Sequence, residues 1–191
     1  MTSNATSSTR KNNANIIFIT TTALMTAVIC ILGPLSIPIG PVPISLTNLA
    51  IYFTMYILDT KRGTIAYLIY LLLGLVGLPV FSGFSAGPQK LFGPTGGYLI
   101  GFIPMALVIG LIVDRFYKKR VLCVIAMEAA TWICYLLGTA WLMFSAQMSF
   151  KAALFAGVIP FIVEDLIKMI IAAIAGPVLR DRLRRFTSLT A

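Results

Sequence analysis

The chain has 191 residues, of which 59% are hydrophobic and 11% are charged. Soluble globular proteins average about 45–50% apolar and about 25% charged residues, so this composition excludes a water-soluble globule and indicates a membrane protein. The formal net charge is +9. Basic loops between membrane spans account for such a surplus, so we do not expect a nucleic-acid partner.

The chain has no histidine and three cysteines, which lie within apolar runs. Catalytic triads and zinc sites that depend on histidine are therefore excluded, and the cysteine spacing matches neither a metal site nor a disulfide framework. We expect no catalytic residues, no metal and no cofactor.

Six apolar segments divide the sequence. After a polar stretch at residues 1–15, which predicts a disordered cytoplasmic tail, apolar runs occupy residues 16–32, 44–58, 64–80, 97–113, 121–143 and 158–179. A helix of about 20 apolar residues spans a bilayer core of about 30 Å. We therefore predict an all-α protein of six transmembrane helices, with one domain over residues 16–182 and a cytoplasmic tail at residues 183–191. A cleaved signal peptide is the alternative for the first run, but no small-residue cleavage site follows it.

The basic residues predict the orientation of these spans. With the N-terminus inside the cell, twelve of the 15 Lys and Arg residues lie on the cytoplasmic face. These twelve are Arg10, Lys11, Lys61, Arg62, Arg115, Lys118, Lys119, Arg120, Arg180, Arg182, Arg184 and Arg185. The outer loops hold Lys90 and Lys151. Because basic residues accumulate in short cytoplasmic loops, both termini are predicted to be cytoplasmic in a multi-pass protein of the cell membrane.

Two outer links have unusual sequences. Residues 33–43 contain four prolines and predict a stiff, extended segment. Residues 81–97 combine glycine, proline and phenylalanine. A plain linker does not require aromatic residues, so we expect this second link to fold over something.

Ionisable residues within apolar spans are costly, by about 2.5–3.5 kcal/mol each, and mark functional sites. Glu164, Asp165 and Lys168 lie close together in the last span, with Asp165 and Lys168 three residues apart on one helical face. They predict either an internal ion pair that lowers the cost of insertion or a polar site for a ligand that enters from outside, and the two readings are compatible. Glu128 lies near the cytoplasmic end of its span and is left outside the site.

Further polar groups lie near the ends of the spans. The turn at residues 93–97 is glycine-rich and directly precedes a span, so it is either a tight helix start or a cradle for an anion. Gln89, Lys90 and Tyr98 are close to it in sequence and could add hydrogen bonds or a charge. No nucleotide-binding loop of the GxxxxGK[ST] type is present, which leaves the chain without a visible means of hydrolysing ATP.

Two spans carry weaker signals. Thr47, Asn48 and Tyr52 open the second span and predict either ligand contacts or hydrogen bonds between helices. Ala23 and Ala27 lie four residues apart in the first span. Small residues at this spacing allow another helix to approach closely, within the same subunit or in a partner.

Four segments together resemble one family. They are GPVPISLT at residues 40–47, GLPVFSG at 77–83, GPTGGYLIGF at 93–102 and IPFIVEDLIK at 159–168. In this combination and order the chain resembles the BioY family, the biotin-specific S components of energy-coupling factor (ECF) transporters, over residues 15–182. The resemblance implies six helices, cytoplasmic termini and high-affinity capture of biotin from the outer side, without enzymatic activity.

Membership would also assign roles to residues. The ureido ring of biotin, with two N–H donors and a carbonyl, suits Asp165 and Lys168, with Glu164 beside them. The thioether ring and valerate chain suit Phe81, Phe84, Phe92, Tyr98 and Trp141, and the valerate carboxylate suits Gln89, Lys90 or the amides of Gly96 and Gly97. Ala23 and Ala27 would dock the transmembrane T component, which is coupled to two ATPase subunits.

Three rival functions differ in what they leave unexplained. An S component for another vitamin would share the architecture but not the pairing of Asp165 and Lys168 with the segment at residues 93–102. An intramembrane enzyme would require a nucleophile with an activating base or a metal cluster. A membrane scaffold without a ligand would leave the aromatic link and the buried charges without a role.

Overall fold

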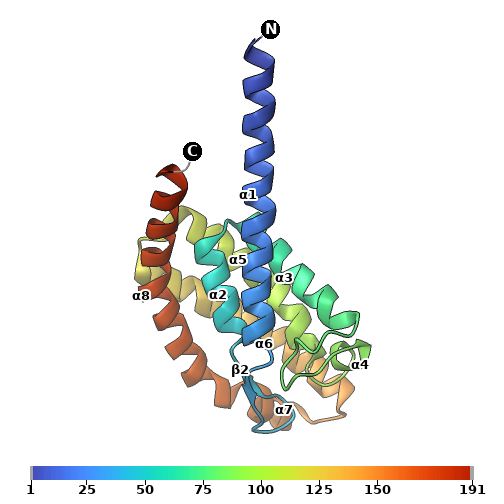
Figure 1. Cartoon of the computed structure of the whole chain (residues 1–191). Helices are drawn as coiled ribbons and strands as arrows, with labels where there is room; N and C mark the ends of the chain where they lie inside the picture. Colours follow the sequence, from blue (N-terminus) through green and yellow to red (C-terminus); the bar gives the residue numbers. More distant parts are fainter. Residues whose placement is uncertain (1, 190–191) are drawn as a thin grey trace.

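Helices make up most of the molecule, which is a computed structural model (Figure 1). It describes residues 2–189, with side chains for residues 16–183 and for Arg185. The helices are α1 (Thr2–Leu32), α2 (Thr47–Ile57), α3 (Thr60–Leu75), α4 (Pro88–Leu91), α5 (Gly96–Phe116), α6 (Arg120–Ser145), α7 (Phe150–Gly157) and α8 (Ile159–Leu189). The predicted tail at residues 1–15 and most of the tail at residues 183–191 lie outside the described side chains.

A short hairpin joins the first two helices. Strands β1 (Ser36–Ile37) and β2 (Ile44–Ser45) pair antiparallel, with Ser36 opposite Ser45 and Ile37 opposite Ile44. The proline-rich link is therefore extended in part, as predicted. Residues 44 and 45, assigned from hydropathy to the second helix, belong instead to β2, and α2 begins at Thr47.

The third helix is displaced towards the N-terminus relative to its apolar run. It begins at Thr60 because Asp59 caps it, accepting a hydrogen bond from the backbone N–H of Arg62 at 2.8 Å. It ends at Leu75, and Gly77 follows with φ +109°, a left-handed conformation that glycine adopts readily. Residues 76–80 are thus outside the helix, contrary to the hydropathy prediction. Helices α4 and α7 were not predicted because both are short.

The lengths of the helices bear on the predicted number of membrane spans. Among the described residues, α5 and α6 are long and apolar enough to cross a membrane, whereas the apolar part of α1, Ile16–Leu32, is shorter. Helix α2 has 11 residues and is about 16 Å long at 1.5 Å per residue. The helical character is confirmed, and the number of membrane spans stays a prediction.

The core lies where α2, α3, α5, α6 and α8 meet. Its largest completely buried side chains include Tyr52, Tyr56, Tyr67 and Tyr70. Helices α5 and α6 approach closely because Gly101 of α5 faces Cys134 of α6, and a Cβ atom at Gly101 would be in tight contact with it. Helix α1 begins and α8 ends at the same end of the molecule, and the hairpin and α7 lie at the opposite end (Figure 1).

Candidate functional site

The three ionisable residues of the last predicted span form a cluster on α8. The Nζ atom of Lys168 lies 2.6 Å from a carboxylate oxygen of Glu164 and 3.6 Å from one of Asp165. Asp165 and Lys168 are 4% and 6% exposed, whereas Glu164 is partly exposed. The internal ion pairs predicted from the spacing are therefore present.

Groups from three other elements, α2, β2 and α6, complete this cluster. The Asn48 amide at the start of α2 donates a hydrogen bond to Asp165 Oδ1, and its own oxygen accepts one from Lys168 Nζ at 2.9 Å. Lys168 also donates to the carbonyl oxygen of Ser45 in β2 at 2.6 Å. Tyr135 of α6 donates to Asp165 Oδ2 at 2.5 Å. A buried acid and base are tolerated only when their remaining hydrogen-bonding positions are filled, and Asn48 fills one on each.

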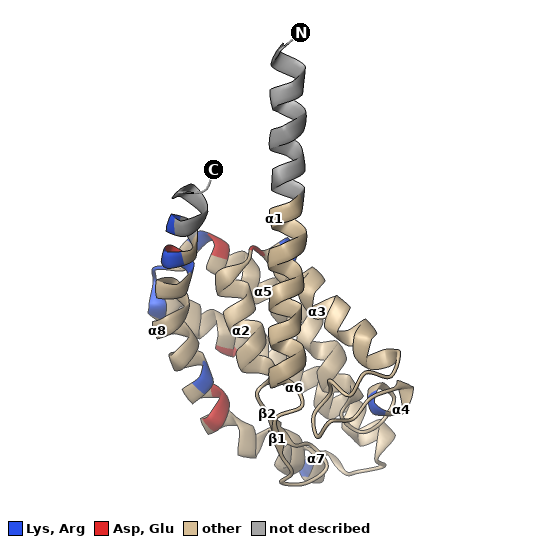
Figure 2. Ribbon diagram, viewed as in Figure 1, with Lys and Arg blue, Asp and Glu red and all other residues tan. Residues whose placement is uncertain are grey.

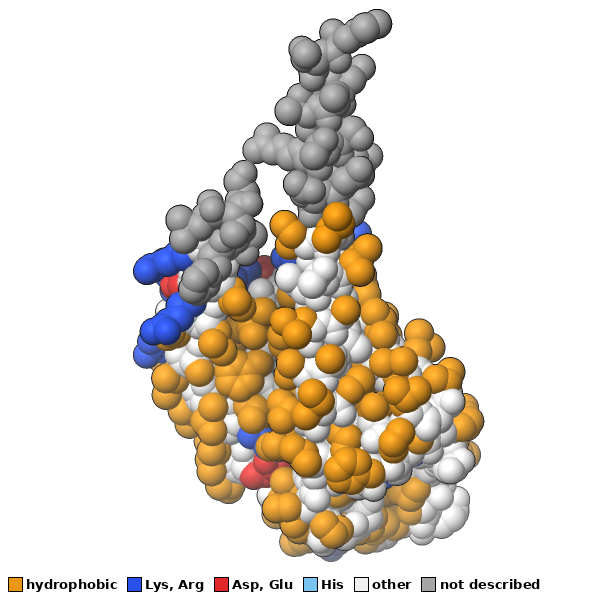
Figure 3. Space-filling model, viewed as in Figure 1, with side chains coloured by type: hydrophobic (Ala, Val, Ile, Leu, Met, Phe, Trp, Pro, Cys, Tyr) orange, Lys and Arg blue, Asp and Glu red, His pale blue; other side chains and the backbone are white. Residues whose placement is uncertain are grey.

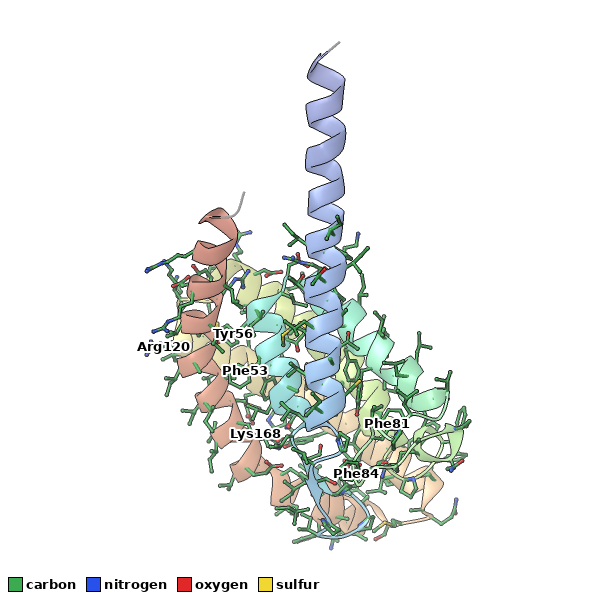
Figure 4. All side chains as sticks on the ribbon, viewed as in Figure 1. Phe53, Tyr56, Phe81, Phe84, Arg120 and Lys168 are labelled. Atoms are coloured by element: carbon green, nitrogen blue, oxygen red, sulfur yellow. The ribbon has the colours of Figure 1, made fainter. Side chains whose placement is uncertain are left out.

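A cavity opens beside the cluster, enclosed by the hairpin, α2, the link before α5, and helices α5, α6 and α8. Figure 3 shows acidic and basic side chains in a recess of an otherwise hydrophobic surface, and Figure 4 labels Lys168 at this level. The cavity is lined by Val42, Pro43, Ser45, Thr47, Asn48, Ser82, Thr95, Tyr98, Leu99, Phe102, Thr131, Cys134, Tyr135, Gly157, Phe161, Glu164, Asp165 and Lys168. Apolar walls with a few convergent polar groups are typical of sites for small molecules.

Two hydroxyl groups of the cavity lining make no hydrogen bond of normal geometry with any residue that the structure describes. They belong to Thr95, just before α5, and to Tyr98, in its first turn, and both are buried. A buried hydroxyl without a partner costs free energy, about 1–3 kcal/mol, that a polar ligand atom would recover. The cavity therefore has a charged side at α8 and a neutral polar side at α5.

Several predicted ligand contacts lie elsewhere. Phe81 is completely buried and packs edge-on against Tyr70, with ring centroids 5.6 Å apart. Phe84 and Phe92 are each 65% exposed, and Gln89 in α4 is exposed too. Lys90 is half-buried, and this burial lowers the pKa of its ammonium group. The structure does not bring these five side chains to the cavity.

The glycine-rich turn and its neighbours serve packing in this conformation. Cβ atoms at Gly96 and Gly97 would collide with Leu91 and with Trp141 of α6. The Trp141 indole donates a hydrogen bond to the carbonyl oxygen of Gly93 at 2.9 Å. Of the two readings of this turn, the structure displays the tight helix start.

The three polar residues of α2 lie differently with respect to the cavity. Thr47 and Asn48 line the cavity. Tyr52 does not, because its hydroxyl lies 2.9 Å from the Thr131 hydroxyl of α6 in a bond between helices. The partly buried Glu128, left outside the site, accepts a hydrogen bond from the Trp132 indole at 3.0 Å.

Sequence reasoning missed several residues of the site. The polar ones are Ser45, Ser82, Thr95, Thr131 and Tyr135, and the aromatic ones are Phe102 and Phe161. Tyr135 and Thr131 carried a usable signal, since polar groups inside an apolar run require a partner. Ser45 carried none, because it contributes its backbone carbonyl.

Ala23 and Ala27 lie on an exposed face of α1 and do not line the cavity. They border an apolar groove between α1 and α3, together with Phe18, Ile19, Thr22, Thr26, Cys30, Ile65, Ile69, Leu73 and Leu78. Because both alanines are exposed, this side of α1 is open to another helix.

A helical membrane protein with a mainly apolar cavity, charged at one side, is the class that this fold and site define. The model of the BioY family matches residues 3–185. The chain belongs to the BioY family.

Relatives and a solved structure agree with this assignment. The chain is 42% identical to the biotin transporter BioY of Thermotoga maritima, over 79% of this chain and 88% of the relative. It is 37% identical to the biotin transporter BioY2 of Lactococcus lactis, over 86% of this chain and 90% of the relative. The crystal structure of the S-component for biotin from an ECF-type ABC transporter superposes with a TM-score of 0.78 at 32% identity, covering 89% of this chain and 94% of that one.

Proposed function

We propose that this chain is the S component of an ECF-type transporter and binds biotin in the cavity beside α8. The cluster of Asp165, Lys168 and Asn48 carries this proposal, because it offers an acceptor and a cationic donor within an apolar cavity. The relatives named as biotin transporters support the same ligand. The role is transport and not catalysis.

The ureido ring of biotin fits the charged side of the cavity. Its two N–H groups match the carboxylates of Asp165 and Glu164, and its carbonyl matches the ammonium of Lys168. Lys168 is bound to Ser45, Asn48 and Glu164 in this structure, so the ligand would exchange with one of these partners. Leu99, Phe102 and Phe161 would surround the thioether ring.

The neutral side of the cavity would receive the valerate end. The hydroxyls of Thr95 and Tyr98 are the donors that line the cavity there without a partner. Gln89 and Lys90, predicted for this role, would reach the ligand only after a movement of α4. Phe84 and Phe92 would have to move with that segment.

Six membrane spans with both termini in the cytoplasm remain part of the proposal. Lys and Arg gather at the end of the molecule where α8 ends, and the hairpin and α7 lie at the other end (Figure 2). Basic residues mark the cytoplasmic side of a membrane protein. The cavity, beside the hairpin, would then open to the outer side of the cell membrane.

Uptake would require partners that supply energy. The exposed alanines Ala23 and Ala27 and the groove beside them fit a helix of a transmembrane T component, because small residues permit close approach. The T component would couple the chain to two ATPase subunits.

Biotin titration of the purified chain in detergent tests the proposed ligand. Trp132 packs edge-on against Tyr135, with ring centroids 5.6 Å apart, and Tyr135 holds Asp165, so tryptophan fluorescence is a suitable signal. Saturable binding of biotin, without competition from thiamine or riboflavin, is expected. Binding of another vitamin in its place would assign the chain to a different substrate.

A matched pair of bulky substitutions tests the docking surface. Ala23→Trp should prevent co-purification with the T component while biotin binding persists. Leu24→Trp is the control, because Leu24 is also exposed on α1 but does not border the groove. Recovery of the Ala23→Trp complex at the control's yield would remove Ala23 from the interface.

A further inference from the structure

A second groove lies between α6 and α8, away from the biotin cavity. It is lined by Arg120, Val121, Val124 and Ile125 of α6 and by Ile170, Ala173 and Ile174 of α8. The α6 positions share one helical face. Every lining side chain except Arg120 is hydrophobic, and five of them are at least partly exposed, so the groove faces the surroundings of the protein.

Arg120 gives this groove a charged end. It is the first residue of α6, and the preceding residue, Lys119, makes no side-chain cap. The amides of the first turn of a helix lack partners within the helix and form the positive end of its dipole. Among the side chains that the structure describes, none forms an ion pair with Arg120.

The surroundings of Arg120 add further positive charge. Lys118 and Lys119 precede it in the sequence and are exposed. The described acids at this end are engaged elsewhere: Asp59 pairs with Arg62 at 2.7 Å, Asp114 pairs with Arg180 at 2.9 Å, and Asp181 accepts a hydrogen bond from the Tyr117 hydroxyl at 3.0 Å. Figure 4 labels Arg120 at the side of the molecule where α8 runs, and Figure 2 shows the basic residues that gather there.

We propose that this groove binds an anionic phospholipid, with an acyl chain against α6 and α8 and the phosphate at Arg120. The apolar lining excludes a free phosphate as the main ligand, because phosphate gains nothing from it. The surplus of positive charge favours an anionic over a zwitterionic headgroup, as basic pockets between membrane helices do.

A lipid in this groove would affect the stability of the protein. The groove lies between α6 and α8, and the same two helices supply Tyr135 and Asp165 to the cavity. A lipid bound across both helices stabilises their packing and raises the melting temperature of the protein by mass action.

Lipid titration of the full chain in a neutral detergent tests the proposal. Phosphatidylglycerol and phosphatidylcholine with identical acyl chains would be compared by native mass spectrometry, which counts retained lipids, and by melting temperature. Phosphatidylglycerol should be retained and should raise the melting temperature at concentrations at which phosphatidylcholine has no effect. Equal effects of the two lipids would overturn the proposal, as would equal protection by inorganic phosphate alone.

Three substitutions separate the groove from general surface charge. Arg120→Gln should weaken phosphatidylglycerol binding about fivefold, the contribution of one basic residue near an anionic surface. Ile174→Trp, at an exposed position, should weaken it by filling the groove. Lys118→Gln removes the same charge outside the groove, where the Lys118 ammonium lies 5.7 Å from the centroid of the Tyr117 ring, and should weaken binding less than Arg120→Gln does.

Two controls show that a loss of binding comes from the missing charge and not from misfolding. Arg120→Lys retains the charge and should restore binding relative to Arg120→Gln. All variants should keep the helical content of the parent chain by circular dichroism. An equal loss in Lys118→Gln and Arg120→Gln would overturn the proposal in favour of unspecific attraction.

Discussion

The charged cluster of α2 and α8 and the glycine-rich, aromatic link at residues 81–97 lie at the same end of the molecule, and ligand contacts are predicted for both. The structure brings Asn48, Asp165 and Lys168 together at the cavity. From the link it brings Ser82 and Thr95, but none of the phenylalanines. The charged cluster therefore lies at the cavity, whereas the phenylalanines of the link lie outside its lining.

The difference between the two regions has a physical cause. A charge inside an apolar helix must find a partner or destabilise the fold, so its presence predicts where polar groups converge. An aromatic ring or a glycine is satisfied by packing alone. Phe81 shows this, since it packs against Gly74, where a Cβ atom would collide with the ring.

The largest expected effect is the loss of biotin affinity in Asp165→Asn and Lys168→Ala. A hydrogen bond to a charged group contributes about 1.5–3 kcal/mol, so each substitution should weaken binding roughly 10- to 100-fold. Calorimetry on the purified variants measures this. Lys151→Ala is the control, because Lys151 is an exposed lysine outside the cavity. Parent-like affinity in both cluster variants would move the site away from α8.

The next effect distinguishes packing from binding at the start of α5. Gly97→Ala places a methyl group against Trp141 and should destabilise the fold by about 1–3 kcal/mol, the usual cost of overpacking. Thermal denaturation in detergent measures this. The folded fraction should bind biotin with an affinity close to that of the parent chain. Gly40→Ala is the control, since nothing lies within 4 Å of a Cβ atom there. A large loss of affinity with unchanged stability would restore the predicted anion cradle.

The sequence predicted the bounds of some helices closely and misplaced those of others. Hydropathy located α5 and α6 to within a few residues, because each is a continuous apolar run. It misplaced the ends of α3, where a cap at Asp59 and a left-handed Gly77 decide the boundaries.

Some residues of the site could be predicted from the sequence, and others could not. Asp165 and Lys168 could be found because their charge is exceptional in an apolar run. Ser45 could not, because a backbone carbonyl has no signature in the sequence. Tyr98 was predicted as a ligand contact. Whether its hydroxyl is available to a ligand depends on the neighbouring side chains, and these are known only from the fold.

A smaller effect is expected on the neutral side of the cavity. Tyr98→Phe and Thr95→Val each remove a buried hydroxyl without a partner, so the free protein should be no less stable. If these hydroxyls bind the ligand, affinity should fall about two- to tenfold, the worth of one neutral hydrogen bond. Calorimetry and thermal denaturation on the same samples separate the two. Unchanged affinity would leave the valerate end without these donors.

The smallest effect is expected in the link itself. Phe84→Ala and Phe92→Ala remove exposed side chains that do not line the cavity, and binding should change less than about twofold, as is usual for surface substitutions. Calorimetry measures the affinity, and stopped-flow fluorescence adds the rate of biotin dissociation. Phe144→Ala is the control, because Phe144 is also highly exposed and outside the cavity.

A faster dissociation in Phe84→Ala alone would contradict this expectation in an informative way. Phe84 has φ +57°, a conformation that non-glycine residues seldom adopt, so the link is held in an unusual geometry at that point. Dissociation that depends on its ring would mean that the link moves over bound biotin, as its composition predicts. The two regions would then act in sequence: the cluster on α8 would select the ligand, and the link would retain it.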